Sequence, residues 1–268
     1  MRTNELQHLF EKYLESTEST ADEVQAAETI QKILLDDDVP VCDELSCIGM
    51  SLPAYRLSGD YYDFIYDEKN GRYWIFIGDV MGKGIPASLL MVMVRSTVRV
   101  LTRYSETPSS LVENLNNILL KDMSRLRAFS TLFCGLFDVD SGQFMYTSAG
   151  HPSPIFIKKN ENVAVRLETK GTVIGLLRDR KYRDFSVTFC PGDLLVLCTD
   201  GILEAMDVDK NQYGYERLQH SIEEHRSFDL DELIHRITDD VRRFSQAVRR
   251  DDVTIVAVRR MEGSVPVC

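Results

Sequence analysis

Two turn signals in the middle of the chain most constrain what it can fold into. Asn70-Gly71, the dipeptide most typical of a tight β-hairpin, lies between the apolar runs "YYDFIY" and "RYWIFI". Ser141-Gly142 separates two further runs of the same kind, "FSTLFCGLFDVD" and "QFMYTSAG". Strands joined by such short turns run antiparallel to each other, so the chain is expected to contain antiparallel sheet.

Helical patterns occupy the segments between and after these hairpins. Residues 85–104 are dense in Leu, Met and Val, and residues 108–123 place apolar side chains on one helical face. Further strands are expected at 154–158, 162–167, 185–189, 194–198 and 253–259, and further helices at 213–224 and 230–248. Because helices come in pairs between runs of strands, the pattern predicts an α+β protein in which helices cover antiparallel sheets.

The N-terminal part of the chain differs from the rest in composition and in its apolar pattern. Residues 3–36 contain no Gly or Pro, and apolar side chains recur at helical spacing in two stretches, 6–14 and 24–34. The apolar stripe of the second stretch can pack on the chain's own domain or pair with another helix, and the sequence leaves both open. Residues 21–36 are therefore a candidate segment for binding an activator or for forming a homodimer.

Charge and composition exclude some classes of partner. The net charge is −11 and the pI is about 5.0, the wrong sign for neutralising the phosphates of nucleic acid. The N-terminus lacks a secretory signal, and the apolar stretch 87–100 is too short to cross a bilayer. The expectation is a cytoplasmic protein with no nucleic acid and no membrane as partner. Six cysteines without C-x-x-C spacing predict reduced thiols rather than a zinc site.

Carboxylates stand at four places where an apolar strand begins or ends. They are Asp60 in "SGDYYD", Asp79 in "FIGDVMGKG", Asp200 in "LLVLCTDGI" and the pair Asp251-Asp252 in "RRDDVTIVAV". A strand end holds a side chain rigidly and still lets it reach solvent, as a metal or catalytic site requires. Any one of them alone is more typical of a turn or a cap, but clustered Asp residues repel each other unless a cation neutralises them.

Oxygen ligands without an accompanying His or Cys set favour Mg²⁺ or Mn²⁺ over Zn²⁺. Two such ions lower the pKa of a bound water and stabilise an in-line displacement at phosphorus, so the predicted chemistry is phosphoester hydrolysis. A nucleotide-binding P-loop does not fit "GDVMGKG". Three residues separate Gly78 from Gly82 where a P-loop needs four, and Gly84 follows Lys83 where it needs Ser or Thr.

The motifs together resemble the PPM-type metal-dependent protein serine/threonine phosphatases, in their bacterial SpoIIE/RsbU branch. The matching segments, in the family's order, are "SGDYYD", "GDVMGKGIPASL", "FSTLFCGLFD", "YTSAGHPSP", "GDLLVLCTDGILEA" and "RRDDVTIVAV". The resemblance implies two stacked antiparallel β-sheets flanked by helix pairs, with an N-terminal helical extension. It implies a linker or regulatory segment over residues 1–40, a phosphatase domain over 41–262 and a tail over 263–268.

The resemblance also implies the ligands of a centre with two Mn²⁺ or Mg²⁺ ions. By motif these are the carboxylates Asp60, Asp79, Asp200 and Asp251, which would be the catalytic residues, with the backbone carbonyl of Val80. Asp252 is implied as a further ligand, although the wider family often has Asn at that place.

Three residues beside these motifs have less defined roles. Asp63 either supports the ligands or is a surface residue. His151 in "AGHPSP" is either a structural turn residue or a general acid. Arg56 precedes "SGD" but does not match the N-terminal Arg with which eukaryotic members hold substrate phosphate, so the metals alone are expected to hold it.

Members of this branch remove phosphate from Ser or Thr of small antagonist proteins that control anti-sigma factors. The resemblance therefore implies a phosphorylated anti-sigma factor antagonist as substrate, and an activity regulated through the N-terminal helix. A binding module that keeps the fold but turns over little substrate is the alternative. The complete set of ligand motifs favours the enzyme.

Overall fold

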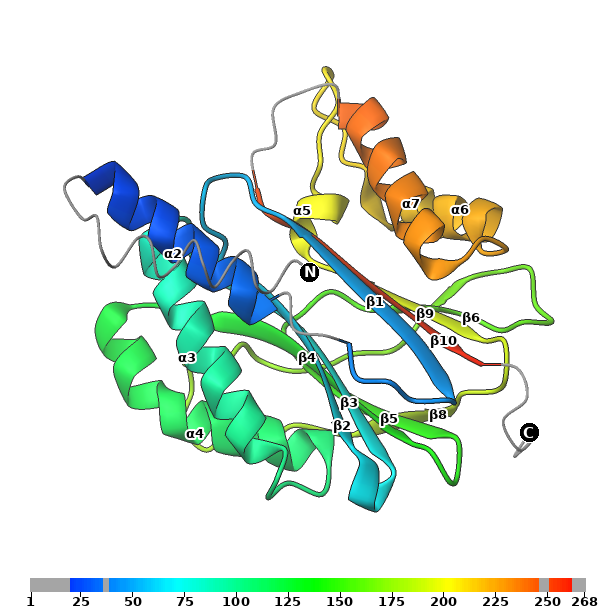
Figure 1. Ribbon diagram of the computed structural model, residues 1–268, viewed down its shortest axis with the longest axis horizontal. Coiled ribbons are helices and arrows are strands. Elements are labelled where there is room, and N and C mark those ends of the chain that lie inside the picture. The colour runs from blue at the N-terminus through cyan, green and yellow to red at the C-terminus, as the bar shows by residue number, and fades with distance from the viewer. Residues whose placement is uncertain (1–19, 36–38, 246–250, 262–268) are drawn as a thin grey trace.

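Two five-stranded antiparallel sheets packed face to face form the centre of the protein (Figure 1). The computed structural model describes residues 20–35, 39–245 and 251–261. One sheet has the strand order β1-β10-β9-β6-β7 and the other β2-β3-β4-β5-β8. The strands are β1 (Leu45–Leu52), β2 (Asp60–Asp67), β3 (Arg72–Val80), β4 (Ser130–Asp138), β5 (Gln143–Ala149), β6 (Ile155–Ile157), β7 (Val165–Arg166), β8 (Phe185–Thr188), β9 (Leu194–Cys198) and β10 (Val253–Arg260). The predicted stack of antiparallel sheets is confirmed.

Both predicted hairpins are present. β2 pairs with β3 so that Asp60 lies opposite Asp79, and β4 pairs with β5 across Gly142. The first connection is longer than a two-residue turn, because a short 3₁₀ helix, η1 (Glu68–Asn70), precedes Gly71. Gly71 has φ of 59°, in the left-handed region that glycine enters most easily, which explains its place in the turn.

Helix pairs cover the outer face of each sheet (Figure 1). On the β2–β5 sheet lie α3 (Ile85–Leu101) and α4 (Pro108–Leu126). On the other sheet lie α6 (Gly214–His225) and α7 (Leu230–Ser245). The four predicted helices are thus confirmed, with ends that differ by a few residues.

Alternation along the strands divides the apolar side chains between the layers. In β3, Trp74 and Phe76 belong to the cluster under α3 and α4, whereas Ile75 and Ile77 belong to the cluster between the two sheets. Successive strand residues point to opposite faces, so a strand covered on both sides must be apolar at nearly every position. This packing leaves the strand ends as the places where polar side chains can reach water.

Helix α2 (Thr20–Leu35) confirms the second predicted N-terminal helix, and it packs on the chain's own domain. Leu35 contacts the apolar cluster under α3 and α4. Gln31 is buried and hydrogen-bonded to the backbone of Ser58. Ile30 is 40% exposed, so part of the apolar stripe remains uncovered by the described residues.

Other sequence-based expectations fare differently. The predicted helix at residues 6–14 lies outside the described residues, and the division into 1–40, 41–262 and 263–268 stays a prediction. The strand expected at 162–167 is only the two-residue β7. The one-turn helix α5 (Asp200–Leu203) is not predicted by periodicity, because four residues are too few to show it.

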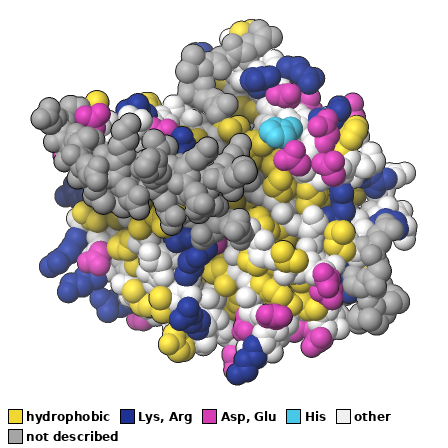
Figure 2. Space-filling view, in the orientation of Figure 1, with side chains coloured by type: hydrophobic (Ala, Val, Ile, Leu, Met, Phe, Trp, Pro, Cys, Tyr) yellow, Lys and Arg dark blue, Asp and Glu magenta, His cyan; other side chains and the backbone are white. Residues whose placement is uncertain are grey.

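The surface of α7 illustrates how the charges are arranged. Figure 2 shows acidic side chains gathered beside a histidine over this helix. Some of them form ion pairs along the helix, among them Arg236 with Glu232 at 2.7 Å and Arg242 with Asp239 at 3.1 Å. Such exposed pairs contribute little to stability but keep the outer face of the helix soluble.

Two further findings concern the thiols and the helices. Cys42, Cys47, Cys134 and Cys198 are free, as expected, but Cys190 is disulfide-bonded, so the expectation of reduced thiols is wrong there. Among the described helices, none combines the length and the apolar character needed to cross a bilayer.

Candidate active site

Asp60 and Asp79 form the first half of the candidate site, at the open end of the β2–β3 hairpin. They are direct cross-strand partners. Asp60 is only 1% exposed, and its Oδ2 accepts a hydrogen bond from the Thr199 hydroxyl at 2.9 Å. Thr199 follows β9, so this bond joins the two sheets at the position of the carboxylates.

The residue before Asp60 has to be glycine because the backbone of β3 comes very close. A Cβ added at Gly59 would lie 2.7 Å from the Val80 carbonyl oxygen and 3.5 Å from Asp79 Oδ1. The Val80 N–H in turn donates to the Gly59 carbonyl at 3.2 Å. Val80, the proposed backbone ligand, is thereby fixed next to the Asp60–Asp79 pair.

Strand β4 holds Asp79 from the other side. Ser130 Oγ donates to the Asp79 carbonyl at 3.0 Å, and the Asp79 N–H donates to Thr131 Oγ1 at 3.2 Å. Thr131 Oγ1 also lies 2.9 Å from Nδ1 of His151. The backbone of Asp79 is therefore held by hydroxyls in addition to the sheet ladder.

Asp200 comes from the opposite sheet, at the start of α5. It follows β9 and Thr199 in the segment "TDG". The next residue, Gly201, packs so tightly that an added Cβ would lie 1.9 Å from the Asp252 carbonyl oxygen. The close contact brings Asp200 next to the Asp251-Asp252 pair, so the glycine after Asp200 is a steric requirement.

Asp251 and Asp252 are adjacent in sequence but differ in surroundings. Asp252 is buried, and its carboxylate accepts three hydrogen bonds: from the Ala54 N–H at 2.7 Å, the Ser58 hydroxyl at 2.7 Å and the Gly59 N–H at 3.0 Å. The Asp251 side chain is about half exposed and forms an ion pair with Lys83, with 3.0 Å between Oδ1 and Nζ. Asp252 therefore holds the loop before β2, while Asp251 faces solvent.

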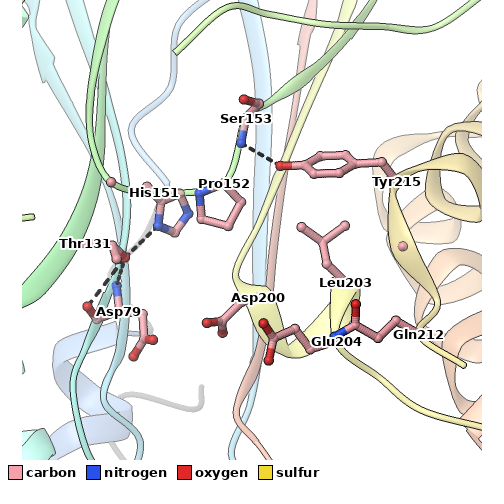
Figure 3. A pocket seen from close by; sticks show the side chains of 12 residues that line it. Asp79, Thr131, His151, Pro152, Ser153, Asp200, Leu203, Glu204, Gln212 and Tyr215 are labelled. Atoms are coloured by element: carbon pink, nitrogen blue, oxygen red, sulfur yellow. Dashed lines mark hydrogen bonds between the residues drawn. The ribbon is translucent and has the colours of Figure 1, made fainter. Parts of the chain in front are cut away.

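Asp79 and Asp200 line a pocket of about 470 Å³ (Figure 3), whereas Asp60, Asp251 and Asp252 are not among its lining residues. In Figure 3, the carboxylates of Asp79 and Asp200 point toward each other from opposite walls, and Glu204 lies beside Asp200. Tyr215 forms the far wall and accepts the Ser153 N–H on its hydroxyl at 2.7 Å. The lining residues are Asp79, Thr131, Gly150, His151, Pro152, Ser153, Asp200, Leu203, Glu204, Gln212, Gly214 and Tyr215.

Burial and neighbouring charges raise the pKa of three carboxylates of the site. Burial, reinforced by the charge of Asp79, raises the pKa of Asp60 well above its usual range. Burial and the charges of Asp200, Asp251 and Asp252 raise the pKa of Asp79 to about 7. Burial and the charge of Glu204 raise the pKa of Asp200. The site therefore holds more negative charge than its surroundings compensate, which a bound cation would relieve.

The donor set fits hard divalent cations. The groups that face the pocket or lie beside it are carboxylate and carbonyl oxygens, the ligands that Mg²⁺ and Mn²⁺ prefer. As the side chains stand, the described residues contain no group of three His, Cys, Asp or Glu that could hold an ion by itself. The carboxylates of Asp79 and Asp200 thus face the pocket from two sides without closing into a preformed cage.

Asp63 and Arg56 do not belong to the pocket. Asp63 is buried, so the surface alternative is wrong; its carboxylate accepts bonds from Arg99 Nε at 2.7 Å and Nη2 at 2.8 Å, and from the Tyr61 hydroxyl at 3.0 Å. This bidentate pair fastens α3 to β2. Arg56 faces α2, where its Nε lies 3.8 Å from a carboxylate oxygen of Glu28.

His151 is buried between the sheets, and burial lowers its pKa to about 3, so the imidazole is neutral at physiological pH. Its Nε2 has no hydrogen-bond partner among the described residues. A fully enclosed neutral imidazole bonded to Thr131 favours the structural alternative over the general acid.

Sequence reasoning identified the carboxylates but missed the groups that hold them. Ser130, Thr131 and Thr199 could have been found from the sequence, because they are hydroxyl residues at the ends of otherwise apolar strands. Gln31 carried none, because it lies in a helix 27 residues before its partner Ser58. The contact of Lys83 with Asp251 joins residues far apart in the sequence and was not foreseeable from spacing.

Known proteins share the sequence of most of this chain. Residues 69–261 match the family described as Stage II sporulation protein E (SpoIIE). The chain is 34% identical over 241 residues to phosphoserine phosphatase RsbU of Bacillus subtilis (strain 168), covering 89% of this chain and 70% of that protein. It is 25% identical over 189 residues to phosphoserine phosphatase RsbP of the same organism, covering 69% of this chain and 46% of that one.

Solved structures share the fold. The SiaA-PP2C domain of Pseudomonas aeruginosa superposes with a TM-score of 0.77 at 21% identity, covering 89% of this chain and 96% of that one. The RsbU and RsbW domains of Rv1364c from Mycobacterium tuberculosis give a TM-score of 0.71 at 23% identity, covering 85% of this chain and 63% of that one. The family match covers more than half of the chain, and the chain belongs to the SpoIIE family.

Proposed function

We propose that the chain is a metal-dependent protein serine/threonine phosphatase that hydrolyses phosphoserine or phosphothreonine on a partner-switching protein, an anti-sigma factor antagonist. The observation that carries the proposal is that Asp79 and Asp200, from opposite sheets, line one open pocket, while Asp60 is the cross-strand partner of Asp79 and the charge of Asp251 adds to burial in raising the pKa of both Asp79 and Asp200. The phosphoserine phosphatases RsbU and RsbP among its relatives support the reaction class. The substrate class rests on the resemblance of the motifs.

In this proposal Asp60, Asp79, Asp200 and Asp251, with the Val80 carbonyl, hold two Mg²⁺ or Mn²⁺ ions. When bound, the ions supply a water of lowered pKa and positive charge for the phosphoryl oxygens. We assign Asp252 to holding Ser58 and Gly59, because its carboxylate already accepts three hydrogen bonds.

The remaining groups of the chain orient these ligands. Thr199 fixes the Asp60 carboxylate, and Ser130 and Thr131 fix the backbone of Asp79. Pre-set ligand positions matter because small displacements at a reacting centre cost orders of magnitude in rate. The pocket is open to solvent at Gln212 and Glu204, where a phosphorylated side chain of a partner can enter.

The test is hydrolysis of a phosphoserine antagonist protein with and without Mn²⁺ or Mg²⁺. Asp79→Asn and Asp200→Asn should each lower kcat/KM by about 100-fold or more, because removing a ligand costs several kcal/mol of charge stabilisation. Asp122→Asn, on the exposed face of α4, is the control and should be unaffected. Unchanged turnover in both site variants would contradict the proposed function.

The rival function, a binding module with little turnover, makes the opposite prediction for a simple substrate. With saturating Mn²⁺, wild-type protein should hydrolyse an aryl phosphate at a rate that Asp79→Asn abolishes. No cation-dependent hydrolysis of either the aryl phosphate or the phosphoprotein would favour the binding module.

We also propose that α2 regulates the site. Gln31 Nε2 donates to the Ser58 carbonyl at 2.7 Å, and the Ser58 N–H donates to Gln31 Oε1 at 2.9 Å. Ser58 in turn bonds Asp252 and, through its Oγ, accepts the Asp60 N–H at 3.0 Å. A shift of α2, caused by an activator or by dimerisation through residues 21–36, would therefore move the segment that leads into Asp60.

Gln31→Ala tests this link, with Gln25→Ala on the exposed side of the same helix as the control. Gln31→Ala should weaken Mn²⁺ binding and activity together by about 5- to 20-fold, corresponding to the loss of one buried bidentate contact. Equal behaviour of both variants, together with unchanged activity and oligomeric state after deletion of residues 1–36, would contradict regulation through α2.

A further inference from the structure

We propose that Lys83 binds the phosphate of the substrate, taking the place that sequence reasoning left to the metal ions alone. The inference deepens the proposed function and rests on it. The sequence around Lys83 does not fit a nucleotide-binding P-loop, so the residue had no assigned role. Its contact with the carboxylate of Asp251 is visible only in the tertiary structure.

A phosphorylated serine brings a charge of about −1.5 to −2 into the site at neutral pH. Among the described residues, those that line the pocket that must accept it include Asp79, Asp200 and Glu204 and no Lys or Arg. His151 also lines the pocket, but its imidazole is neutral. A basic side chain at the edge of the pocket would offset the repulsion between the substrate and these carboxylates.

Lys83 does not line the pocket itself, but it lies beside the proposed ligand set. It lies in the loop between β3 and α3, four residues after Asp79, and its Nζ is 3.0 Å from Asp251 Oδ1. Arg56, the basic residue before "SGD", is directed instead toward Glu28 on α2. The contact with Asp251 therefore brings a positive charge directly to the proposed ligand set.

The ion pair is of a kind that can exchange partners. The Lys83 side chain is 39% exposed and that of Asp251 52%, and an ion pair this exposed contributes little to stability. When Asp251 shares its charge with a divalent cation, the ammonium group is available to a phosphate oxygen.

The first experiment measures phosphate binding without turnover. Inorganic phosphate is titrated calorimetrically into Mg²⁺-loaded wild type, Lys83→Met, Lys83→Arg and the control Lys181→Met, whose lysine forms a comparable exposed pair with Glu113 at 2.7 Å. Lys83→Met should weaken phosphate binding about 10-fold. Lys83→Arg should stay within about 3-fold, and Lys181→Met should match wild type. Equal phosphate affinity in wild type and Lys83→Met, or no phosphate binding by wild type, would overturn the inference.

A second measurement separates substrate binding from support of the metal site. Mg²⁺ affinity should be unchanged or higher in Lys83→Met, since the ammonium group competes with a cation for Asp251. If Lys83→Met loses Mg²⁺ affinity, the lysine supports the cation site and the inference is wrong.

These experiments test phosphate binding by Lys83 separately from the proposed phosphatase activity. Lys83-dependent phosphate binding without any turnover would overturn the proposed function and keep the inference. Turnover of the phosphoprotein with the same KM in wild type and Lys83→Met would keep the function and overturn the inference. The expected result is a KM raised about 10-fold in Lys83→Met, with kcat changed much less.

Discussion

Asp60 and Asp79 lie directly opposite each other on neighbouring antiparallel strands, at the solvent end of a ladder whose other positions are mostly apolar. Like charges in facing positions destabilise a sheet, so this pair opposes folding unless something compensates it. Burial is the largest cause of the raised pKa of both residues; the charge of Asp79 adds to it at Asp60, and the charges of Asp200, Asp251 and Asp252 add to it at Asp79. The arrangement is understandable as a site kept ready for a cation.

The stability of the cation-free protein should fall as pH rises. The pKa of Asp79 is about 7 in the fold, against an ordinary value of about 3.9 in the unfolded chain. Between these values the folded state binds more protons than the unfolded state, so the free energy of unfolding decreases from about pH 4 to about pH 7. With a chelator present, thermal unfolding should occur at a lower temperature at pH 8 than at pH 5, by the equivalent of on the order of 1 to 3 kcal/mol.

Asp79→Asn should flatten this pH dependence, and Asp122→Asn should leave it as in wild type. Added Mg²⁺ or Mn²⁺ should stabilise the wild-type protein more at pH 8 than at pH 5, because the carboxylates are ionised there. Identical unfolding temperatures at both pH values in the presence of chelator would contradict the electrostatic account of the site.

Gly59→Ala should damage the site more than the fold. The added Cβ would meet the Val80 carbonyl at 2.7 Å, so the segment leading into Asp60 must shift. We expect activity to fall at least about 10-fold, because ligand positions are sensitive to shifts of this size. Gly71→Ala, at the other end of the same hairpin, should lower stability by about 1 kcal/mol through its positive φ and leave kcat/KM unchanged. Comparable activities in the two variants would argue against the close approach at Gly59.

Asp251→Asn and Asp252→Asn should lower the free energy of unfolding by different amounts. Asp252 accepts three hydrogen bonds in a buried position, so Asn there leaves a buried donor unpaired and should cost about 1 to 3 kcal/mol of unfolding free energy. Asp251→Asn removes an exposed pair with Lys83 and should cost less than about 1 kcal/mol. Urea unfolding with chelator present measures both, and an Asp251→Asn variant as unstable as Asp252→Asn would refute this division of roles.

The pair of Asp63 with Arg99 should matter for stability and little for chemistry. Arg99→Met leaves the buried Asp63 carboxylate without its bidentate partner and should destabilise the protein by about 2 kcal/mol, while the double variant Asp63→Asn/Arg99→Met should lose less than the sum of the single changes. Activity of the folded fraction should stay within about 3-fold of wild type. A loss as large as that of Asp79→Asn would place Asp63 among the ligands instead.

Local sequence signals predicted most of the architecture. The Asn70-Gly71 and Ser141-Gly142 turns and the helical stripes of 85–104 and 108–123 depend on neighbouring residues only, and all are confirmed. β7 and α5 were predicted poorly or not at all, because two or four residues carry no periodicity. The motifs around Asp60, Asp79, Asp200 and Asp251 were visible because each ends or begins an apolar strand.

The sequence by itself determined which residues can be ligands and which strands carry them, since alternation, turn glycines and strand-end carboxylates are properties of short segments. Only the tertiary structure decided how those segments meet: that the Asp252 carboxylate accepts hydrogen bonds from the Ser58 hydroxyl and the Gly59 N–H, that Gln31 on α2 reaches the same loop, and that Lys83 contacts Asp251. The reason is physical. Hydrogen bonds and ion pairs between distant segments depend on how two sheets and their helices pack, and no local pattern encodes that packing.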